Sequence, residues 1–411
     1  MKKILLGTTG LVGAALLATA ASAETPKVTL GGFSDFQAGW VGGDEANGIE
    51  GTSGRSIAFR NDNEISVRVD GKTDAGLGYG AVIDLEADLS PDVDNEGTNA
   101  SRTYTYLEGG WGRVELGGNK SVAATMRVDA STLAVGSGGI NGAWHYFVNP
   151  DGTTAVPTAA APFATGGAAA GFITSSKLQV EHGSVDVLGD ESDYNDTKAT
   201  YYTPRFYGLQ AGVSYTPNTS DKGQIASRLN TVGYDNVWDV GLGYETQWSG
   251  VKIAASGTGE WAETNVVGAA DIRGWNAGAL LGWQGFSLAG SYGDWATGHL
   301  VVPGGAVLGG VAGTGGTAAL SSDGNGSYWT AGLGYDAGPI GLSATWLDSK
   351  LGAGAATGQN KFHNLVLGAD YKLAPGLTPY AEVSFYDFNY AAAGAASNSG
   401  DSVILGTQVA F

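Results

Sequence analysis

Residues 64–70 read Glu-Ile-Ser-Val-Arg-Val-Asp, and polar and apolar side chains alternate along the whole stretch. The alternation returns in residues 77–86 (LGYGAVIDLE), after a short turn at residues 73–75. Successive side chains of a strand point to opposite faces, so each stretch predicts a strand with one apolar and one polar face. Two such strands joined by a tight turn predict an antiparallel hairpin.

The same pattern continues along the chain in segments separated by turn residues. Short turns such as Ser249-Gly250 and Gln284-Gly285 follow even-numbered segments, whereas connections after odd-numbered segments are mostly long and rich in Gly, Asn, Asp and Ala. This rhythm predicts an all-β transmembrane antiparallel barrel, closed because an open edge would leave unpaired backbone groups in lipid. The sixteen expected strands lie near residues 27–41, 62–72, 76–88, 101–109, 111–118, 197–203, 206–216, 237–248, 250–260, 274–283, 285–294, 327–336, 338–347, 362–373, 377–389 and 402–411.

Composition excludes several classes of protein. The chain has 411 residues, 69 Gly and no Cys, so disulfides, thiol nucleophiles and Cys-ligated metals are ruled out. Four His residues leave little room for a metal cage. Asp plus Glu number 40 against 21 Lys plus Arg, a balance that argues against nucleic-acid binding.

The N-terminus has the form of a bacterial export signal. Lys2 and Lys3 precede an apolar stretch at residues 4–20, and Ala21-Ser22-Ala23 forms a small-residue cleavage site. We therefore expect residues 1–23 to be a signal peptide and residues 24–411 to be the barrel. Without Lys2 and Lys3 the chain keeps 21 − 2 = 19 bases against 40 acids, a balance of −21.

Aromatic residues near the strand ends support a membrane barrel. Their parity predicts that they point outward, where interfacial aromatic girdles lie. This set comprises Trp238, Tyr244, Trp275, Trp283, Trp329, Tyr335 and Trp346. In the last strand Val403, Leu405, Thr407, Val409 and the terminal Phe411 share one parity and are expected to face lipid.

The connection between the fifth and sixth strands, residues 119–196, is unlike the others. A loop of this length without structure of its own is rare in a compact domain, so we expect it to fold back into the lumen as a constriction loop. Residues 177–188 (KLQVEHGSVDVL) alternate, and a hairpin there would extend the barrel to eighteen strands. We favour sixteen.

The chain resembles the general porins of Gram-negative bacteria, of the trimeric sixteen-stranded alphaproteobacterial kind. The motifs that carry this resemblance are residues 63–69 (NEISVRV) followed by 75–80 (AGLGYG), 102–109 (RTYTYLEG) with 112–117 (GRVELG), 201–208 (YYTPRFYG) and the terminal Phe411. The short acidic and aromatic motif usual in the constriction loop of that family is not visible here, which leaves the constriction residues open.

The resemblance implies an outer-membrane homotrimer whose wall bases face acids on the inserted loop. Arg68, Arg102 and Arg113 fit the basic wall, with Lys120 and Arg127 near the base of the loop. The candidate loop acids are Asp129, Asp151, Glu181 and Asp186. Parity also places Glu64, Asp84 and Glu86 on the lumen side. Outer-membrane lipid and lipopolysaccharide would surround the barrel.

A sixteen-stranded barrel is wide enough for a water channel, which predicts passive diffusion of small hydrophilic solutes and ions. The acid excess favours cations, because a negative lumen concentrates them. The alternative is a substrate-specific channel for a sugar or another nutrient. The aromatic residues at 144–147 (WHYF) could stack on a sugar, although such clusters more often anchor a loop to a wall.

Two further classes remain as alternatives: a secreted or surface β protein without a pore, and an outer-membrane hydrolase. Residues 332–337 (GLGYDA) fit a dinucleotide motif formally but lie within an expected strand. Residues 400–403 (GDSV) resemble a hydrolase nucleophile motif, but they begin the last expected strand and no His is nearby in sequence. We therefore expect no enzyme activity and no cofactor. Residues 92–97 (DVDNEG) open like a calcium loop but lack its Glu at position twelve, so a surface divalent cation such as calcium is a weak alternative.

Overall fold

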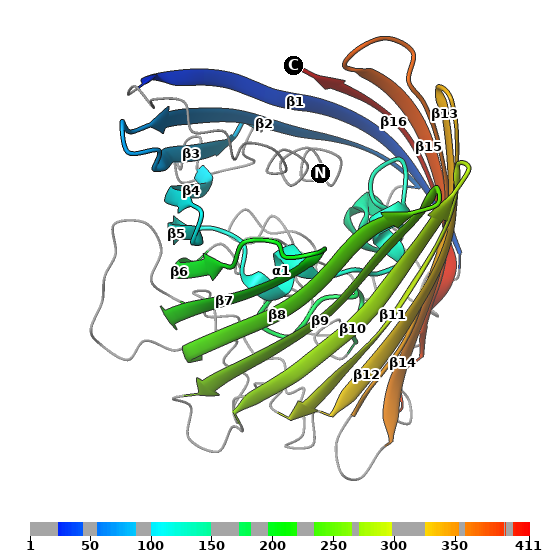
Figure 1. Cartoon of the computed structure of the whole chain (residues 1–411). Helices are drawn as coiled ribbons and strands as arrows, with labels where there is room; N and C mark the ends of the chain where they lie inside the picture. Colours follow the sequence, from blue (N-terminus) through cyan, green and yellow to red (C-terminus); the bar gives the residue numbers. More distant parts are fainter. Residues whose placement is uncertain are drawn as a thin grey trace, which may run out of the picture.

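The computed structural model describes residues 24–43, 56–87, 100–148, 172–181, 196–219, 234–264, 271–297, 325–352, 358–389, 391 and 398–411. These residues form a closed barrel of sixteen antiparallel strands, in which each strand pairs with its neighbours in sequence and the first pairs with the last (Figure 1). The expected signal peptide and residues 92–97 lie outside the described residues.

Every expected strand has a counterpart in the structure. The strands are β1 (Glu24–Gly43), β2 (Ile57–Lys72), β3 (Gly78–Glu86), β4 (Ala100–Gly109), β5 (Gly112–Gly118), β6 (Thr197–Tyr202), β7 (Leu209–Asn218), β8 (Tyr234–Trp248), β9 (Val251–Thr264), β10 (Ile272–Trp283), β11 (Phe286–Thr297), β12 (Gly326–Ala337), β13 (Ile340–Gly352), β14 (Gln359–Tyr371), β15 (Leu377–Asn389) and β16 (Asn398–Ala410). The prediction of sixteen strands rather than eighteen is confirmed for the described residues.

Burial alternates along the strands as the sequence pattern predicts. In β13 nearly every second side chain is buried, and Ser343, Thr345 and Leu347 face inward while Leu342 faces out. The outer face carries many exposed apolar side chains, whereas the inner face is rich in Ser, Thr, Asn, Asp and Glu. A soluble monomer rarely exposes so much apolar surface, and lipid is the solvent that suits it.

The predicted aromatic residues also point outward. Trp238, Trp275, Trp283 and Trp329 are 48%, 46%, 56% and 43% exposed. In β16, Leu405, Val409 and the terminal Phe411 are exposed as predicted. Phe411 also helps to close the barrel, because its backbone exchanges hydrogen bonds with Gly32 of β1 at 3.0 and 3.1 Å.

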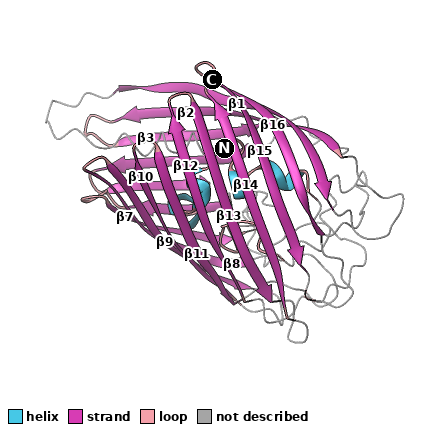
Figure 2. Cartoon of the chain, turned by 90° about the vertical axis from the view of Figure 1, so that its right-hand side faces the viewer, coloured by secondary structure: helices cyan, strands magenta, loops and turns pink. Residues whose placement is uncertain are grey.

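Two-residue turns join several strand pairs at one end of the barrel (Figure 2). Ser249-Gly250 has φ values of 49° and 83°, and Gln284-Gly285 has values of 47° and 86°. Positive φ at both central residues defines the turn whose twist matches an antiparallel hairpin, and glycine takes the second position without strain. The short-turn prediction is therefore confirmed at both sites.

The chain between β5 and β6 enters the barrel, where its helical turns lie inside the ring of strands (Figure 1). These turns are α1 (Val122–Met126), η2 (Ala130–Leu133), η3 (Gly139–Asn141) and η4 (Ala143–Tyr146). Residues 172–181 also lie against the inner wall and form no strand. Within the described residues, no helix has the length and apolar character needed to cross a membrane.

Candidate functional site: the lumen between the inserted loop and strands β1 to β5

The inserted loop lies along one side of the lumen and leaves the other side open. Helix α1 contacts β7, β8 and β9, η2 contacts β11 to β13, η3 contacts β13 and β14, and η4 contacts β16. Strands β2 to β5 make no comparable contact with these helical turns. The lumen is therefore bounded by the loop on one side and by the first strands on the other.

A row of wall hydroxyls binds the backbone of the loop. Each hydroxyl accepts a hydrogen bond from a loop N–H group that the short helical turns leave unpaired. We call these residues the hydroxyl row. Val122 N donates to Ser214 Oγ (3.1 Å), Val128 N to Ser256 Oγ (2.8 Å), Ala130 N to Thr330 Oγ1 (3.2 Å), Val135 N to Ser343 Oγ (3.1 Å) and Ile140 N to Thr345 Oγ1 (3.1 Å).

Two buried wall glutamates hold the loop at further points. Glu382 of β15 accepts hydrogen bonds from Ser137 Oγ and from the N–H groups of Gly138 (3.3 Å) and Gly139 (3.2 Å). Glu260 of β9 accepts from the N–H groups of residues 180 (2.7 Å) and 181 (3.2 Å). Each carboxylate spans two successive amides, so it fixes the direction of the loop as well as its position.

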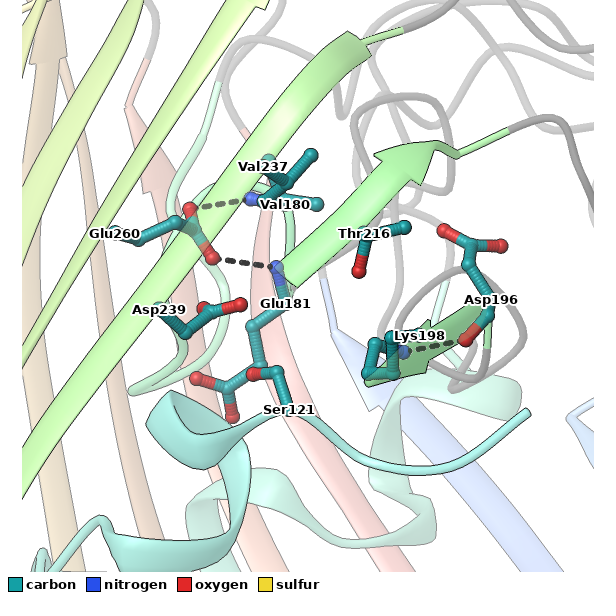
Figure 3. Close-up of a pocket in the computed structure, with 9 residues that line it drawn as sticks. All are labelled: Ser121, Val180, Glu181, Asp196, Lys198, Thr216, Val237, Asp239 and Glu260. Atoms are coloured by element: carbon teal, nitrogen blue, oxygen red, sulfur yellow. Dashed lines mark hydrogen bonds between the residues drawn. The ribbon is translucent and has the colours of Figure 1, made fainter. Parts of the chain in front are cut away.

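Near Glu260, both arms of the loop meet the wall around a small cavity (Figure 3). Lys198 of β6 donates from Nζ to the carbonyl oxygens of Asn119 (2.5 Å) and Asp196 (2.8 Å). Asp239 of β8 accepts from Ser214 Oγ at 3.2 Å. The cluster therefore ties the beginning and the end of the inserted loop to β6, β8 and β9.

Glycine and aromatic packing complete this wall. A Cβ at Gly278 of β10 would overlap the carbonyl oxygen of Val128, so the loop backbone lies directly on the strand there. Trp144 is 1% exposed and stacks on Phe362 of β14 with ring centroids 5.6 Å apart. Of the aromatic cluster at residues 144–147, Trp144 thus anchors the loop, whereas Tyr146 is 41% exposed.

Strands β2 to β5 present a charged inner surface, which we call the charged wall. Arg68 pairs with Asp70 at 2.9 Å, and Arg102 pairs with Asp84. Arg113 pairs with two carboxylates, Glu108 at 2.8 Å and Glu115 at 2.6 Å. The arginine side chains keep 35%, 20% and 24% of their surface exposed, in chain order, so they remain accessible to water in the lumen.

Tyr106 of β4 links the ion pairs of the charged wall. The Arg113 guanidinium lies 3.8 Å from the centre of its ring, within the range of a cation–π interaction. The Tyr106 hydroxyl donates to Asp70, which also accepts from Arg68. These contacts fix the arginines in position along the lumen.

The structure places the predicted residues in two groups, one on or beside strands β2 to β5 and the other on the inserted loop. Arg68, Arg102, Arg113 and Asp84 belong to the charged wall, and Glu64 and Glu86 are half-buried cross-strand neighbours on β2 and β3. Lys120 is half-buried just after β5.

The loop residues behave differently from the expectation. We expected Asp129 and Glu181 to face the wall arginines across the water. Both instead pair with Arg127 of the same loop, and the two carboxylates are 1% and 2% exposed. They stabilise the fold of the loop because a buried charge needs a close partner. Asp151 and Asp186 lie outside the described residues.

Sequence reasoning missed Arg60, which reaches from β2 to the loop. Its guanidinium lies 3.8 Å from the centre of the Tyr146 ring and pairs with Asp62 at 3.1 Å. Arg60 and Arg68 both lie on β2, an even number of residues apart, so their side chains point to the same face. The expected strand began at residue 62, and a start at residue 57 would have predicted that Arg60 faces the lumen. Among the described residues, no group of three or more His, Asp or Glu side chains is arranged to hold a metal ion.

Comparison with known proteins gives one consistent result. A family model described as Gram-negative porin matches residues 7–391. An uncharacterised protein of Rickettsia conorii is 24% identical over 371 residues, which cover 76% of this chain and 77% of the relative.

Solved structures resemble the fold over 94% of this chain and all of their own length. They include an anion-selective porin from Comamonas acidovorans (16% identity, TM-score 0.57) and the trimer form of the outer-membrane protein OmpT of Vibrio cholerae (10%, 0.57). A mutant Rh. blastica porin is also similar (15%, 0.51).

Proposed function

The chain belongs to the Gram-negative porin family and is an outer-membrane β-barrel, and we propose that it is a passive channel for small hydrophilic solutes and ions with a preference for cations. Family and fold point to a channel rather than to an enzyme. One observation carries the proposal: the charged wall, with its partly exposed arginine and carboxylate groups, faces the inserted loop inside a closed barrel.

The balance of charges in the lumen supports the cation preference. The inner face of β1 to β5 carries more carboxylates than bases. The carboxylates are Asp35, Asp62, Glu64, Asp70, Asp84, Glu86, Glu108 and Glu115, and the bases are Lys27, Arg60, Arg68, Lys72, Arg102 and Arg113. An excess of fixed negative charge raises the local concentration of cations. We propose that the charged wall, and not the buried loop acids, supplies this field.

The short strands support a homotrimer. Strands β5 and β6 have 7 and 6 residues. At about 3.3 Å per residue and a tilt near 40° they reach roughly 18 and 15 Å, less than the ~25 Å apolar band of a membrane barrel. We propose that this side of the barrel faces neighbouring copies and that the longer strands face lipid and lipopolysaccharide.

Planar-bilayer recording tests the channel. Purified protein is expected to insert in discrete steps of current in KCl. Sugars added at increasing concentration are expected to leave the current without saturable block, whereas a substrate-specific channel would show such block by its ligand. Folded protein that inserts without any step of current would refute the channel and favour a β protein without a pore.

A further inference from the structure

A small polar pocket lies at the edge of the lumen, where the loop meets β1, β2 and β16. Its Arg60 and Asp62 lie on β2 and belong to the charged wall, whereas Asp35 and Gln37 lie on the neighbouring β1. We call it the Asp35 pocket. The residues that give it its chemistry are Asp35, Gln37, Arg60, Asp62, Asn141 and Tyr146.

Hydrogen bonds hold several polar groups of the pocket around the Asp35 carboxylate. Asp35 Oδ2 accepts from Gln37 Nε2 (3.1 Å) and from the Tyr380 hydroxyl (2.8 Å). Gln37 Oε1 in turn accepts from Arg60 (3.3 Å). The second oxygen, Asp35 Oδ1, is buried and has no hydrogen-bond partner within the described part of the chain. The residue is only 6% exposed, so bulk water does not satisfy this oxygen.

The charged groups and the volume of the pocket indicate which kind of ligand it binds. Asp35 and Asp62 bring two carboxyl groups to the pocket, whereas Arg60 brings one guanidinium, so the acids outnumber the arginines in the lining. The cavity holds about two groups the size of a water molecule, too little for a sugar ring. A primary ammonium group is of that size, carries one positive charge and only donates hydrogen bonds.

We propose that the Asp35 pocket binds the primary ammonium group of small cationic solutes as they pass the constriction. The ammonium donates to Asp35 Oδ1, while the rest of the solute stays in the lumen beside the exposed ring of Tyr146. The assignment rests on the proposed channel function, because the solute reaches the pocket through the lumen. The pocket would give the cation preference a defined binding site, whereas the overall charge of the lumen does not distinguish one cation from another.

The test compares ethylammonium with tetramethylammonium, which has the same charge but no N–H donor and a larger head. Each is titrated against the K⁺ current of the channel in a planar bilayer at constant chloride. Ethylammonium is expected to lower the current with a saturable midpoint, whereas tetramethylammonium is expected to lower it without saturation. Asp35→Asn should raise the ethylammonium midpoint at least about tenfold, as loss of a charge-assisted hydrogen bond requires.

Glu108→Gln provides the matched control, because it removes the same charge from the same side of the lumen outside the pocket. Its midpoint is expected to stay within about twofold of the wild type, since a distant charge acts only through the screened field. Asparagine is nearly isosteric with aspartate, and an unchanged unfolding temperature in detergent shows that the Asp35→Asn barrel is intact.

Three results overturn the site. Equal midpoints for Asp35→Asn and the wild type exclude Asp35 as the ligand, and equal shifts in Asp35→Asn and Glu108→Gln show a general charge effect. Saturable block by tetramethylammonium excludes a site built for N–H donors. In all three cases the K⁺ current persists, so the proposed channel function is not contradicted. Absence of any K⁺ current in the wild type would overturn the channel and, with it, the site.

Discussion

Strands β7 to β15 and strands β1 to β5 line the same lumen, but they use different side chains. The first group meets the loop with hydroxyls, glycines and two buried glutamates, and it binds loop backbone groups. The second group carries arginines paired with carboxylates, partly exposed to the lumen. One side of the barrel therefore positions the loop, and the other side keeps its charge available to passing ions.

This division follows from solvation. Neutral hydroxyls can be buried cheaply when each satisfies a loop amide, whereas charges lose hydration when they are covered. Covered ionisable groups have close partners: Arg127 pairs with Asp129 and Glu181 within the loop, and Glu382 of the wall accepts from loop N–H groups. Substitutions in β7 to β15 should therefore alter the position of the loop. Substitutions in β1 to β5 should alter ion selectivity.

The largest effect is expected for Arg102→Ala. Asp84 is 1% exposed and would keep a buried charge without its partner, which costs about 3 kcal/mol of the free energy of unfolding. Urea titration followed by tryptophan fluorescence in detergent measures the loss. Glu245→Ala is the control, because the Arg205–Glu245 pair is exposed and its atoms are 3.6 Å apart, so it contributes less than about 1 kcal/mol. Equal losses in both variants would contradict the burial argument.

Glu382→Ala should weaken the hold on the loop. Ser137, Gly138 and Gly139 lose their shared acceptor, and the unfolding free energy is expected to fall by about 2 kcal/mol. Release of the loop should also give a larger and noisier single-channel current. Glu382→Gln retains one acceptor oxygen and should show a smaller change in both. A wild-type current in Glu382→Ala would show that this contact does not position the loop.

Gly278→Val tests the close approach of the loop to β10. The new side chain would occupy the position of the Val128 carbonyl, and overpacking of this kind costs about 1–3 kcal/mol. Single-channel conductance should change because the loop must move. Gly257→Val is the control, since the space at Gly257 of β9 is open. A conductance change of the same size in both variants would speak against direct contact.

The smallest expected effects separate the two sides of the lumen in one experiment. Ser343→Ala removes the acceptor of Val135 N and should lower stability by about 1 kcal/mol without changing the reversal potential. Arg68→Ala removes a partly exposed charge and should shift the reversal potential towards cations, with less than about 1 kcal/mol of stability lost. The opposite pattern would contradict the division of roles.

Sequence reasoning predicted the strands well because their signal is local. Alternation with a period of two, ending at turn residues, sets each strand and the direction of side chains such as Trp283 and Leu405. The second strand was predicted from residue 62 and begins at Ile57, and the shorter limit hid Arg60.

The path of the loop could not be predicted in the same way. Val122 meets a hydroxyl 92 residues away, and Val135 meets one 208 residues away, so no local pattern encodes these contacts. Asp129 and Glu181 were expected in the water because charged residues are usually exposed. Their burial depends on Arg127, which only the folded loop brings to both of them.

The zero-current potential of the wild-type channel across a KCl gradient probes the charge that the lumen presents to ions. A charged wall with more carboxylates than arginines predicts the sign of a cation-preferring channel, and a potential that shrinks as both salt concentrations rise and screening increases. A potential of the opposite sign would contradict this description of the charged wall, because anions would then carry most of the current.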